Sequence, residues 1–177
     1  ESEEKLKGRG VSACATCDGF FFKDKEVCLV GGGDVAIEDA LFMAKIAKKV
    51  TIINRRDELR ATHVLQQRVY AEPKIEFVWW SNVKEVLGEQ NVTGVQIENT
   101  KDGKVSEIPC SALFIAIGHK PNTEIFRGKL KILPNGFIER IDKSKTSVSG
   151  VFVAGDVFDY EYRQAITAAG SGAQAAI

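Results

Sequence analysis

Residues 26–36 read EVCLVGGGDVA, and this stretch decides the fold class of the chain. Its first part, Glu26–Val30, is apolar after the opening glutamate, as in a parallel strand that is covered on both faces. Three glycines follow, and a helical pattern then runs from residue 34 to about residue 47. A second apolar run at residues 50–53 completes a strand–helix–strand unit, whose two strands we expect to be parallel with a right-handed crossover.

The glycine turn has the spacing Gly31-x-Gly33-x-x-Ala36. In a dinucleotide-binding turn the first glycine permits the tight bend, the second lets the backbone approach a pyrophosphate, and a small third residue lets helix and strand pack closely. The phosphates would rest on the helix N-terminus, where free N–H groups favour anions. A glycine turn without a ligand is the alternative, but the flanking strands and helix favour a bound dinucleotide.

The end of the second strand indicates which nucleotide would bind. An NAD site usually has an acidic residue about 20 positions after the glycines, where it holds the ribose 2′-hydroxyl. Arg55 and Arg56 stand at that place, with Arg60 one helical turn further on. Guanidinium groups suit a 2′-phosphate because their planar forks bond its oxygens with charge assistance. Asp57 and Glu58 could instead pair with the arginines on a solvated surface, but the position of the cluster favours NADPH over NADH.

Cys14 and Cys17 form a CxxC pair, with Asp18 directly after it. Two cysteines at this spacing can close a small disulfide ring, and a helical turn there can lower the pKa of one thiol. Disulfide exchange needs a thiolate and a proton donor, and Asp18 could serve as that acid or base. Half of a zinc site is the alternative, but the sequence has no second CxxC and no HxxxH. We therefore predict a redox pair and no metal.

The remaining cysteines and the two histidines receive no role in the chemistry. Cys28 and Cys110 stand alone in or beside apolar runs, and we expect both to be buried core thiols. His63 falls in a predicted helix and His119 follows a glycine, and neither has an evident partner in the sequence.

The rest of the chain changes character near Pro121. Before it, apolar patterns predict a helix at residues 61–71 and strands at residues 76–80, 83–87, 92–98, 105–110 and 113–117. The middle three of these strands alternate between turn signals, so we expect an antiparallel meander with Pro109 at an edge or a strand end. Beyond Pro121, a strand at residues 151–154 leads to Gly155-Asp156 and, from about residue 163, to a helix rich in Ala and Gly.

The composition excludes several classes of function. The 24 basic side chains balance the 24 acidic ones, so no basic excess supports nucleic-acid or anionic-membrane binding. No apolar run approaches the roughly 20 residues of a membrane-spanning helix, and the charged start lacks the apolar core of a signal peptide. We therefore expect a soluble, cytoplasmic protein that binds neither nucleic acid nor membranes.

Several segments resemble the small, bacterial-type thioredoxin reductases, in the order in which that family has them. They are residues 8–19 (GRGVSACATCDG), residues 31–38 (GGGDVAIE), Arg55-Arg56 through Arg60, residues 116–122 (AIGHKPN), Gly155-Asp156 and Arg163-Gln164-Ala165. Two features depart from the family. Asn54 stands where relatives often have another residue, and the family's opening FAD-binding glycine-rich unit has no counterpart before residue 1. Residues 1–8 contain no complete element, so we expect a fragment.

The resemblance implies an α/β fold with a Rossmann-like, three-layer NAD(P)-binding domain that carries a β-meander, plus part of a similar FAD-binding domain. The NADPH-binding domain with its CxxC site would be residues 1–122, and the incomplete C-terminal part of the FAD-binding domain would be residues 123–177. The resemblance assigns cofactor contacts to Gly31, Gly33, Asp34, Ala36, Arg55, Arg56, Arg60, Ile117, Gly118, Gly155, Asp156, Arg163, Gln164 and Ala165.

The activity that the resemblance implies is thioredoxin-disulfide reduction with FAD and NADPH as cofactors. Electrons would pass from NADPH through FAD to a Cys14–Cys17 disulfide and from there to thioredoxin. Cys14 would attack the substrate, Cys17 would face the flavin, and Asp18 would manage protons. The complete enzyme would be a homodimer.

Two other functions remain open. One is an isolated NADPH-binding module without turnover. The other is an NADH-dependent disulfide reductase flavoprotein that serves a peroxidase, and both Ala15-Thr16 and the arginine pair count against it.

Overall fold

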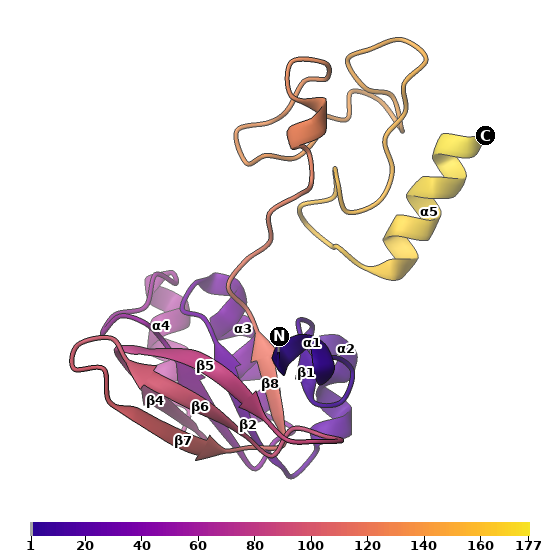
Figure 1. Cartoon of the computed structure of the whole chain (residues 1–177). Coiled ribbons are helices and arrows are strands. Elements are labelled where there is room, and N and C mark those ends of the chain that lie inside the picture. Colours follow the sequence, from indigo (N-terminus) through magenta and orange to yellow (C-terminus); the bar gives the residue numbers. More distant parts are fainter. Residues whose placement is uncertain (1) are drawn as a thin grey trace. The chain divides into compact units, whose positions relative to one another are not determined.

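The computed structural model describes residues 2–177, and these fold into two compact units. The first unit ends at Gly118, and the second spans His119–Ile177 (Figure 1). No helix in this described part of the chain is long and apolar enough to cross a membrane.

A five-stranded parallel sheet forms the middle of the first unit. Its strands, in spatial order, are β1 (Val11–Ser12), β8 (Ala112–Ile115), β2 (Glu26–Val30), β3 (Lys49–Ile53) and β4 (Ile75–Val78). β2 pairs in parallel with β3 along its whole length, which confirms the predicted strand–helix–strand unit. Because every neighbouring pair is parallel, the carboxyl ends of all five strands lie at one edge, where sheets of this kind bind ligands.

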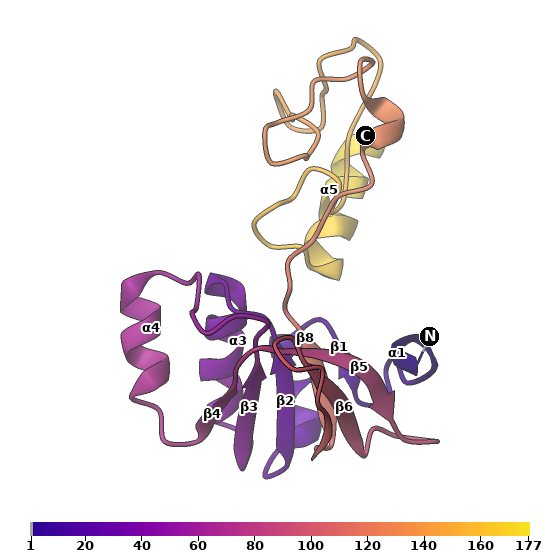
Figure 2. The ribbon, with the colours of Figure 1, turned by 60° about the vertical axis from the view of Figure 1, so that its left-hand side comes forward.

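Helices cover one face of this sheet, and Figure 2 shows α3 and α4 there. The helical segments of this layer are α2 (Ala15–Asp18), the 3-10 turn η1 (Gly19–Phe22), α3 (Asp34–Ala44) and α4 (His63–Tyr70). A hydrophobic core between helices and sheet includes Val27 and Leu29 of β2 and Ile37 of α3, all fully buried. Full burial of one such side chain stabilises the fold by about 1.5–3 kcal/mol.

An antiparallel three-stranded sheet covers the opposite face (Figure 1). Its strands, in order, are β5 (Ser81–Leu87), β6 (Gly94–Asn99) and β7 (Val105–Pro109). A second core lies between the two sheets, and it contains Cys28 of β2 and Leu113 of β8. β2 therefore sends Val27 and Leu29 to one face and Cys28 to the other, which explains its uninterrupted apolar run. The arrangement confirms the predicted three-layer α/β class with a β-meander, and Pro109 ends the edge strand.

The second unit contains little regular structure. Its helical segments are η2 (Glu124–Phe126) and α5 (Ala165–Ala176). The strand expected at residues 151–154 is wrong, because only Phe152 forms a β-bridge there, with Lys145. A run of β-forming residues becomes a strand only beside a partner strand, and this ladder stops after one pair. α5 begins after Gln164, which shares a reciprocal cap with Thr167.

Several boundaries in the first unit also differ from the sequence prediction. α3 ends at Ala44 instead of near residue 47, because the amide of Ile46 donates to the Met43 carbonyl oxygen and tightens the chain into a turn. β8 ends at Ile115, two positions before the predicted end. A one-turn helix, α1 (Ser2–Lys5), lies where no complete element was expected. Elements of one turn are too short for hydrophobic periodicity to reveal.

Candidate functional site

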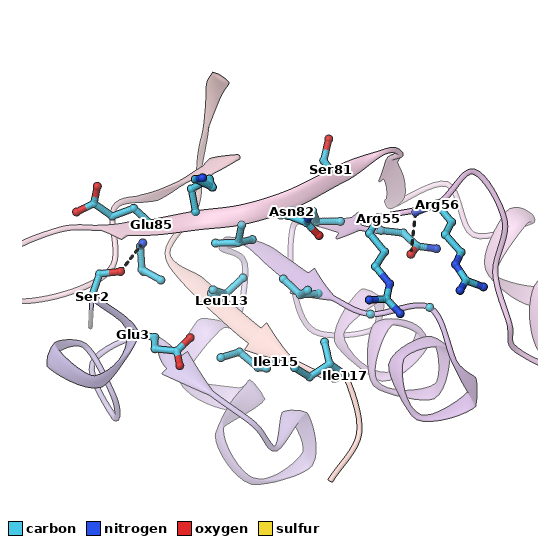
Figure 3. Close-up of a pocket in the computed structure, with 18 of the residues that line it drawn as sticks. Ser2, Glu3, Arg55, Arg56, Ser81, Asn82, Glu85, Leu113, Ile115 and Ile117 are labelled. Carbon is cyan, nitrogen blue, oxygen red and sulfur yellow. Dashed lines mark hydrogen bonds between the residues drawn. The ribbon is translucent and has the colours of Figure 1, made fainter. Parts of the chain in front are cut away.

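A pocket of about 540 Å³ opens at the carboxyl ends of β2, β3 and β8. The glycine turn and the segment after β3 form its polar wall. The apolar part of the lining includes Leu113, Ile115 and Ile117. Figure 3 shows Arg55 and Arg56 at one end of the pocket and Glu3 and Glu85 at the other. The pocket is therefore charged at both ends with an apolar floor between them, and its size suits a nucleotide.

The glycine turn has the geometry that its spacing requires. Gly31 has φ +149°, and a Cβ there would strike the carbonyl oxygen of Ala116 and come within 2.8 Å of the Cβ of Ala36. Gly33 is the N-cap residue of α3, and a Cβ there would meet nothing within 4 Å. Gly33 therefore has open space beside it at the start of α3, where a phosphate fits. Gly118 is the last residue of the first unit, and it has φ +95°.

Three arginines border the same pocket. Arg55, Arg56 and Arg60 are exposed, and across residues 2–177 none of them forms an ion pair. Asp57 and Glu58 therefore do not pair with these arginines, and the alternative of a neutralised surface cluster is wrong. Guanidinium groups that lack carboxylate partners fit a phosphate on the adenosine ribose. The residues present thus fit NADPH.

Asp34 is engaged within the protein. Its Oδ1 accepts the amide hydrogen of Thr62 at 2.6 Å, which ties the start of α3 to the end of the arginine-bearing segment. The carboxylate of Asp34 therefore binds the backbone of this segment, and its role in the structure is to fix the segment beside α3.

The CxxC pair forms a disulfide at the start of α2. Cys14 is the N-cap residue, and its Sγ accepts the amide hydrogen of Cys17 at 3.2 Å. The Oγ1 of Thr16 lies 3.4 Å from the same sulfur. After reduction these two donors would stabilise a thiolate on Cys14, because hydrogen bonds to a charged form favour it. Cys17 is exposed and Cys14 half-buried, so another molecule can reach the pair.

Asp18 is oriented by Ser12, a residue that no sequence motif singled out. Ser12 donates its hydroxyl hydrogen to Oδ2 of Asp18 at 2.6 Å and accepts the amide hydrogen of Cys14 at 3.1 Å. β1, which contains Ser12, thereby holds both ends of the disulfide turn. No spacing rule points to this serine, and its place in the GRGVSACATCDG segment is the one signal that the sequence offers.

Two exposed phenylalanines follow the disulfide turn. Phe20 and Phe21 are 70% and 80% exposed. A hollow of about 430 Å³ adjoins Phe21, and its lining also includes Ser12 and Asp18. Large aromatic side chains that stay exposed beside a reactive pair are typical of a surface that contacts another protein.

The other two cysteines are free and buried, as predicted. Cys28 is 0% and Cys110 is 6% exposed, and both belong to the core between the two sheets. Contact with the Cys110 thiol, and then burial, raise the pKa of the Cys28 thiol. Both effects keep Cys28 protonated and out of exchange chemistry. Within residues 2–177 no group of three or more His, Cys, Asp or Glu side chains could hold a metal ion.

The predicted FAD contacts of the second unit lie at and before the start of α5. Gly155 has φ +76°, and its amide donates to Oγ of Ser171 at 3.0 Å. Asp159, which was not predicted, accepts the amide hydrogen of Arg163 at 3.1 Å. Nη1 of Arg163 lies 3.1 Å from Nδ1 of His119, so the histidine that the sequence left without a partner has one. The exposed members of the predicted set are Asp156, Gln164 and Ala165.

FAD fits these residues only in part. Across residues 2–177 the β2–α3 junction is the one strand–glycine turn–helix unit. The second unit therefore offers side-chain and backbone contacts without a pyrophosphate turn of its own.

Comparison with known proteins gives both a family and close relatives. Residues 1–172 match the pyridine nucleotide-disulphide oxidoreductase family. The thioredoxin reductases of Streptomyces coelicolor and Rickettsia felis are 53% and 51% identical to the chain over 99% of its length. The chain covers 55% and 58% of those two proteins, so it spans about half the length of the curated relatives it matches.

Solved structures show the same likeness. The thioredoxin reductase of Streptococcus pyogenes matches with a TM-score of 0.91 and 43% identity, over 98% of this chain and 57% of that one. The thioredoxin reductase of Giardia duodenalis matches with a TM-score of 0.86 and 44% identity, over 99% of this chain and 58% of that one. The resemblance inferred from the sequence motifs is confirmed.

Proposed function

The chain belongs to the pyridine nucleotide-disulphide oxidoreductase family, and from this premise we propose that it supplies the NADPH site and the redox disulfide of a thioredoxin reductase. One observation carries the proposal: a single compact unit combines a nucleotide pocket bordered by three exposed arginines with a reachable disulfide. Such a pocket selects a dinucleotide with an extra phosphate, and an exposed CxxC disulfide is typically a redox group.

Residues 1–122 are assigned to the NADPH-binding domain and residues 123–177 to part of the FAD-binding domain. In the first, the turn at Gly31 and Gly33 holds the pyrophosphate on the N-terminus of α3, and the arginines bind the 2′-phosphate. The proposed contacts to FAD are Gly155, Asp156, Arg163, Gln164 and Ala165. When bound, NADPH supplies a hydride and FAD relays its two electrons toward the disulfide.

The exchange chemistry uses Cys14, Cys17 and Asp18. In the reduced state the Cys14 thiolate attacks one sulfur of the substrate disulfide, which forms a mixed disulfide and releases the other sulfur as a thiolate that takes a proton. Cys17 then attacks Sγ of Cys14, which forms the Cys14–Cys17 disulfide and releases the second substrate sulfur. Asp18 is the proposed acid or base for these proton transfers, and the hydrogen bond that it accepts from Ser12 holds its carboxylate beside the turn.

Thioredoxin is the proposed substrate, because the relatives of this chain carry the name thioredoxin reductase. Phe20 and Phe21 support a protein partner, since they offer apolar contact area three and four residues after Cys17. We propose that the complete enzyme is cytoplasmic, as the composition indicates, and that it is a homodimer, as the resemblance implies.

The test uses the reduced 177-residue chain with oxidised thioredoxin. We expect the wild type to convert thioredoxin to its dithiol and the Cys17→Ser variant to stop at a mixed disulfide through Cys14, visible as one added mass under non-reducing conditions. Cys28→Ser is the matched control and should exchange like the wild type. If the wild type binds NADP⁺ but exchanges no disulfide, the chain is a nucleotide-binding module and the proposal fails.

A further inference from the structure

The segment that carries the arginines is tied to the glycine turn that it faces. We call residues 54–62 the arginine loop. The amide of Arg60 donates to the carbonyl oxygen of Gly32 at 2.7 Å. Two residues later, the amide of Thr62 donates to Oδ1 of Asp34 at 2.6 Å. The far end of the arginine loop is therefore anchored both to the turn and to the first residue of α3.

Asn54 anchors the near end of the same loop. The residue is 8% exposed, its Nδ2 donates to the carbonyl oxygen of Glu58 at 2.9 Å, and its Oδ1 accepts the amide hydrogen of Arg56 at 3.4 Å. The side chain thus spans the stretch that contains Arg55 and Arg56, in the manner of an Asx turn. Without it the Glu58 carbonyl and the Arg56 amide lose these partners, and the backbone between them becomes free to rearrange.

Asn54 also sets the spacing between the arginine loop and the glycine turn. A Cβ placed on Gly32 would lie 2.7 Å from Nδ2 of Asn54, so the amide packs directly against the glycine. Gly32 does not have a positive φ. This contact, and not the backbone conformation, is what a larger residue at position 32 would disturb.

We propose that Asn54 is a positioning residue for nucleotide selection. It holds the arginine loop at the distance from the glycine turn at which Arg55 and Arg56 reach a 2′-phosphate while the pyrophosphate rests on α3. Preorganised groups bind more tightly because less ordering is required on binding. The inference rests on the proposed NADPH function. It adds that Asn54, which carries no charge itself, affects nucleotide selection through the position of the arginine loop.

Calorimetric titration of the 177-residue chain with NADP⁺ and with NAD⁺ tests this role through the ratio of the two dissociation constants. We expect the wild type to prefer NADP⁺. Asn54→Ala should reduce the preference about three- to tenfold, because NADP⁺ loses well-aligned phosphate contacts that NAD⁺ never makes. Asn91→Ala is the matched control, since this asparagine is exposed in the β5–β6 turn, and it should leave the ratio unchanged.

A second variant perturbs Asn54 without removing it. Gly32→Ala should displace the Asn54 amide and lower the preference to a similar degree. In the Asn54→Ala background the new methyl group has room, so the double variant should match Asn54→Ala instead of adding to it. If Asn54→Ala does not fold, Gly32→Ala by itself still tests the positioning role, because it displaces the Asn54 amide without removing it.

The outcomes separate the two proposals. An unchanged ratio in Asn54→Ala and Gly32→Ala overturns the positioning role, as do equal losses for both nucleotides, which would mean that Asn54 only supports the pyrophosphate turn. Either result leaves the NADPH site standing. A wild type that does not prefer NADP⁺ overturns both the NADPH site and the role of Asn54.

Discussion

The two units of this chain hold their functional residues in different ways. The first unit buries one hydrophobic cluster on each face of its parallel sheet, and its nucleotide pocket lies at the ends of the strands that these clusters fix. In the second unit α5 buries only Ser171, while Ile166 on the same helix is 80% exposed. The residues from Gly155 to Ala165 are thus held mainly by hydrogen bonds, and the buried apolar side chains of this described unit are few: Phe137, Ile138 and Val153. The contrast shows that the sequence motifs of the first unit form a pocket because a hydrophobic core fixes the strands that carry them.

Hydrogen exchange should show the largest difference between the two units. Amides of β2, β3 and β8 should exchange at least about a thousandfold more slowly than those of α5, because buried strands open only with the whole unit whereas an exposed helix opens locally. Exchange followed by mass spectrometry on peptides from both units measures the difference. Equal protection of α5 would contradict the view that the second unit lacks support of its own.

Thiol labelling compares the redox cysteines of the first unit with the cysteines of its core. After reduction, Cys14 and Cys17 should react with an aromatic disulfide reagent at least about a hundredfold faster than Cys28 and Cys110, since solvent-accessible thiolates react and fully buried thiols do not. Labelled peptides counted over time give the four rates, and denaturant should bring the rates together. Rapid labelling of Cys28 in the native protein would show that the core between the sheets is open.

Nucleotide binding tests which unit carries the phosphate contacts. Replacing Arg55 and Arg56 with Ala should weaken NADP⁺ by roughly 1–3 kcal/mol for each lost charge-assisted contact and affect NAD⁺ far less. Arg127→Ala, at an exposed arginine of the second unit that pairs with Glu124, is the matched control and should change neither affinity. Equal losses for both nucleotides would count against the 2′-phosphate role, and a loss in the control would contradict its assignment to the first unit.

The smallest expected effect is on the pH dependence of the free energy of unfolding, and it comes from Asp39 on α3. Burial, and then the neighbouring Glu38, raise the pKa of Asp39 from 3.8 to about 6. The folded state therefore holds this proton more tightly than the unfolded state, and the free energy of unfolding falls as pH rises from about 4 to about 6. Because the side chain is only half-buried, we expect Asp39→Asn to stabilise by about 1 kcal/mol at neutral pH and by nothing near pH 3.

Denaturant unfolding of the wild type and of Asp39→Asn at both pH values checks this linkage. Glu38→Gln is the control, because Glu38 is exposed and its charge is the smaller cause of the shift. It should give a smaller gain. A stabilisation of Asp39→Asn that does not change with pH would contradict the titration of Asp39.

Local patterns in the sequence were enough to predict most of the first unit. The bounds of β2 match the prediction, the helix and strand after it follow, and the meander is antiparallel with Pro109 at its edge. These features depend on spacings of two to four residues, which the chain order shows directly. The CxxC pair, the glycine turn and the arginines were found in the same way, because each is a short motif with its own chemistry.

Contacts between distant segments were decided only by the tertiary structure. The hydrogen bond from Thr62 to Asp34 and the packing of Asn54 against Gly32 join residues that no spacing rule connects. The strand expected at residues 151–154 failed for the same reason, since strand formation depends on a partner that the local sequence does not contain. The sequence by itself thus determined which motifs this protein carries and which elements surround them. The packing of separate segments decided how each motif is held, because hydrogen bonds and close contacts depend on distances that only the folded chain has.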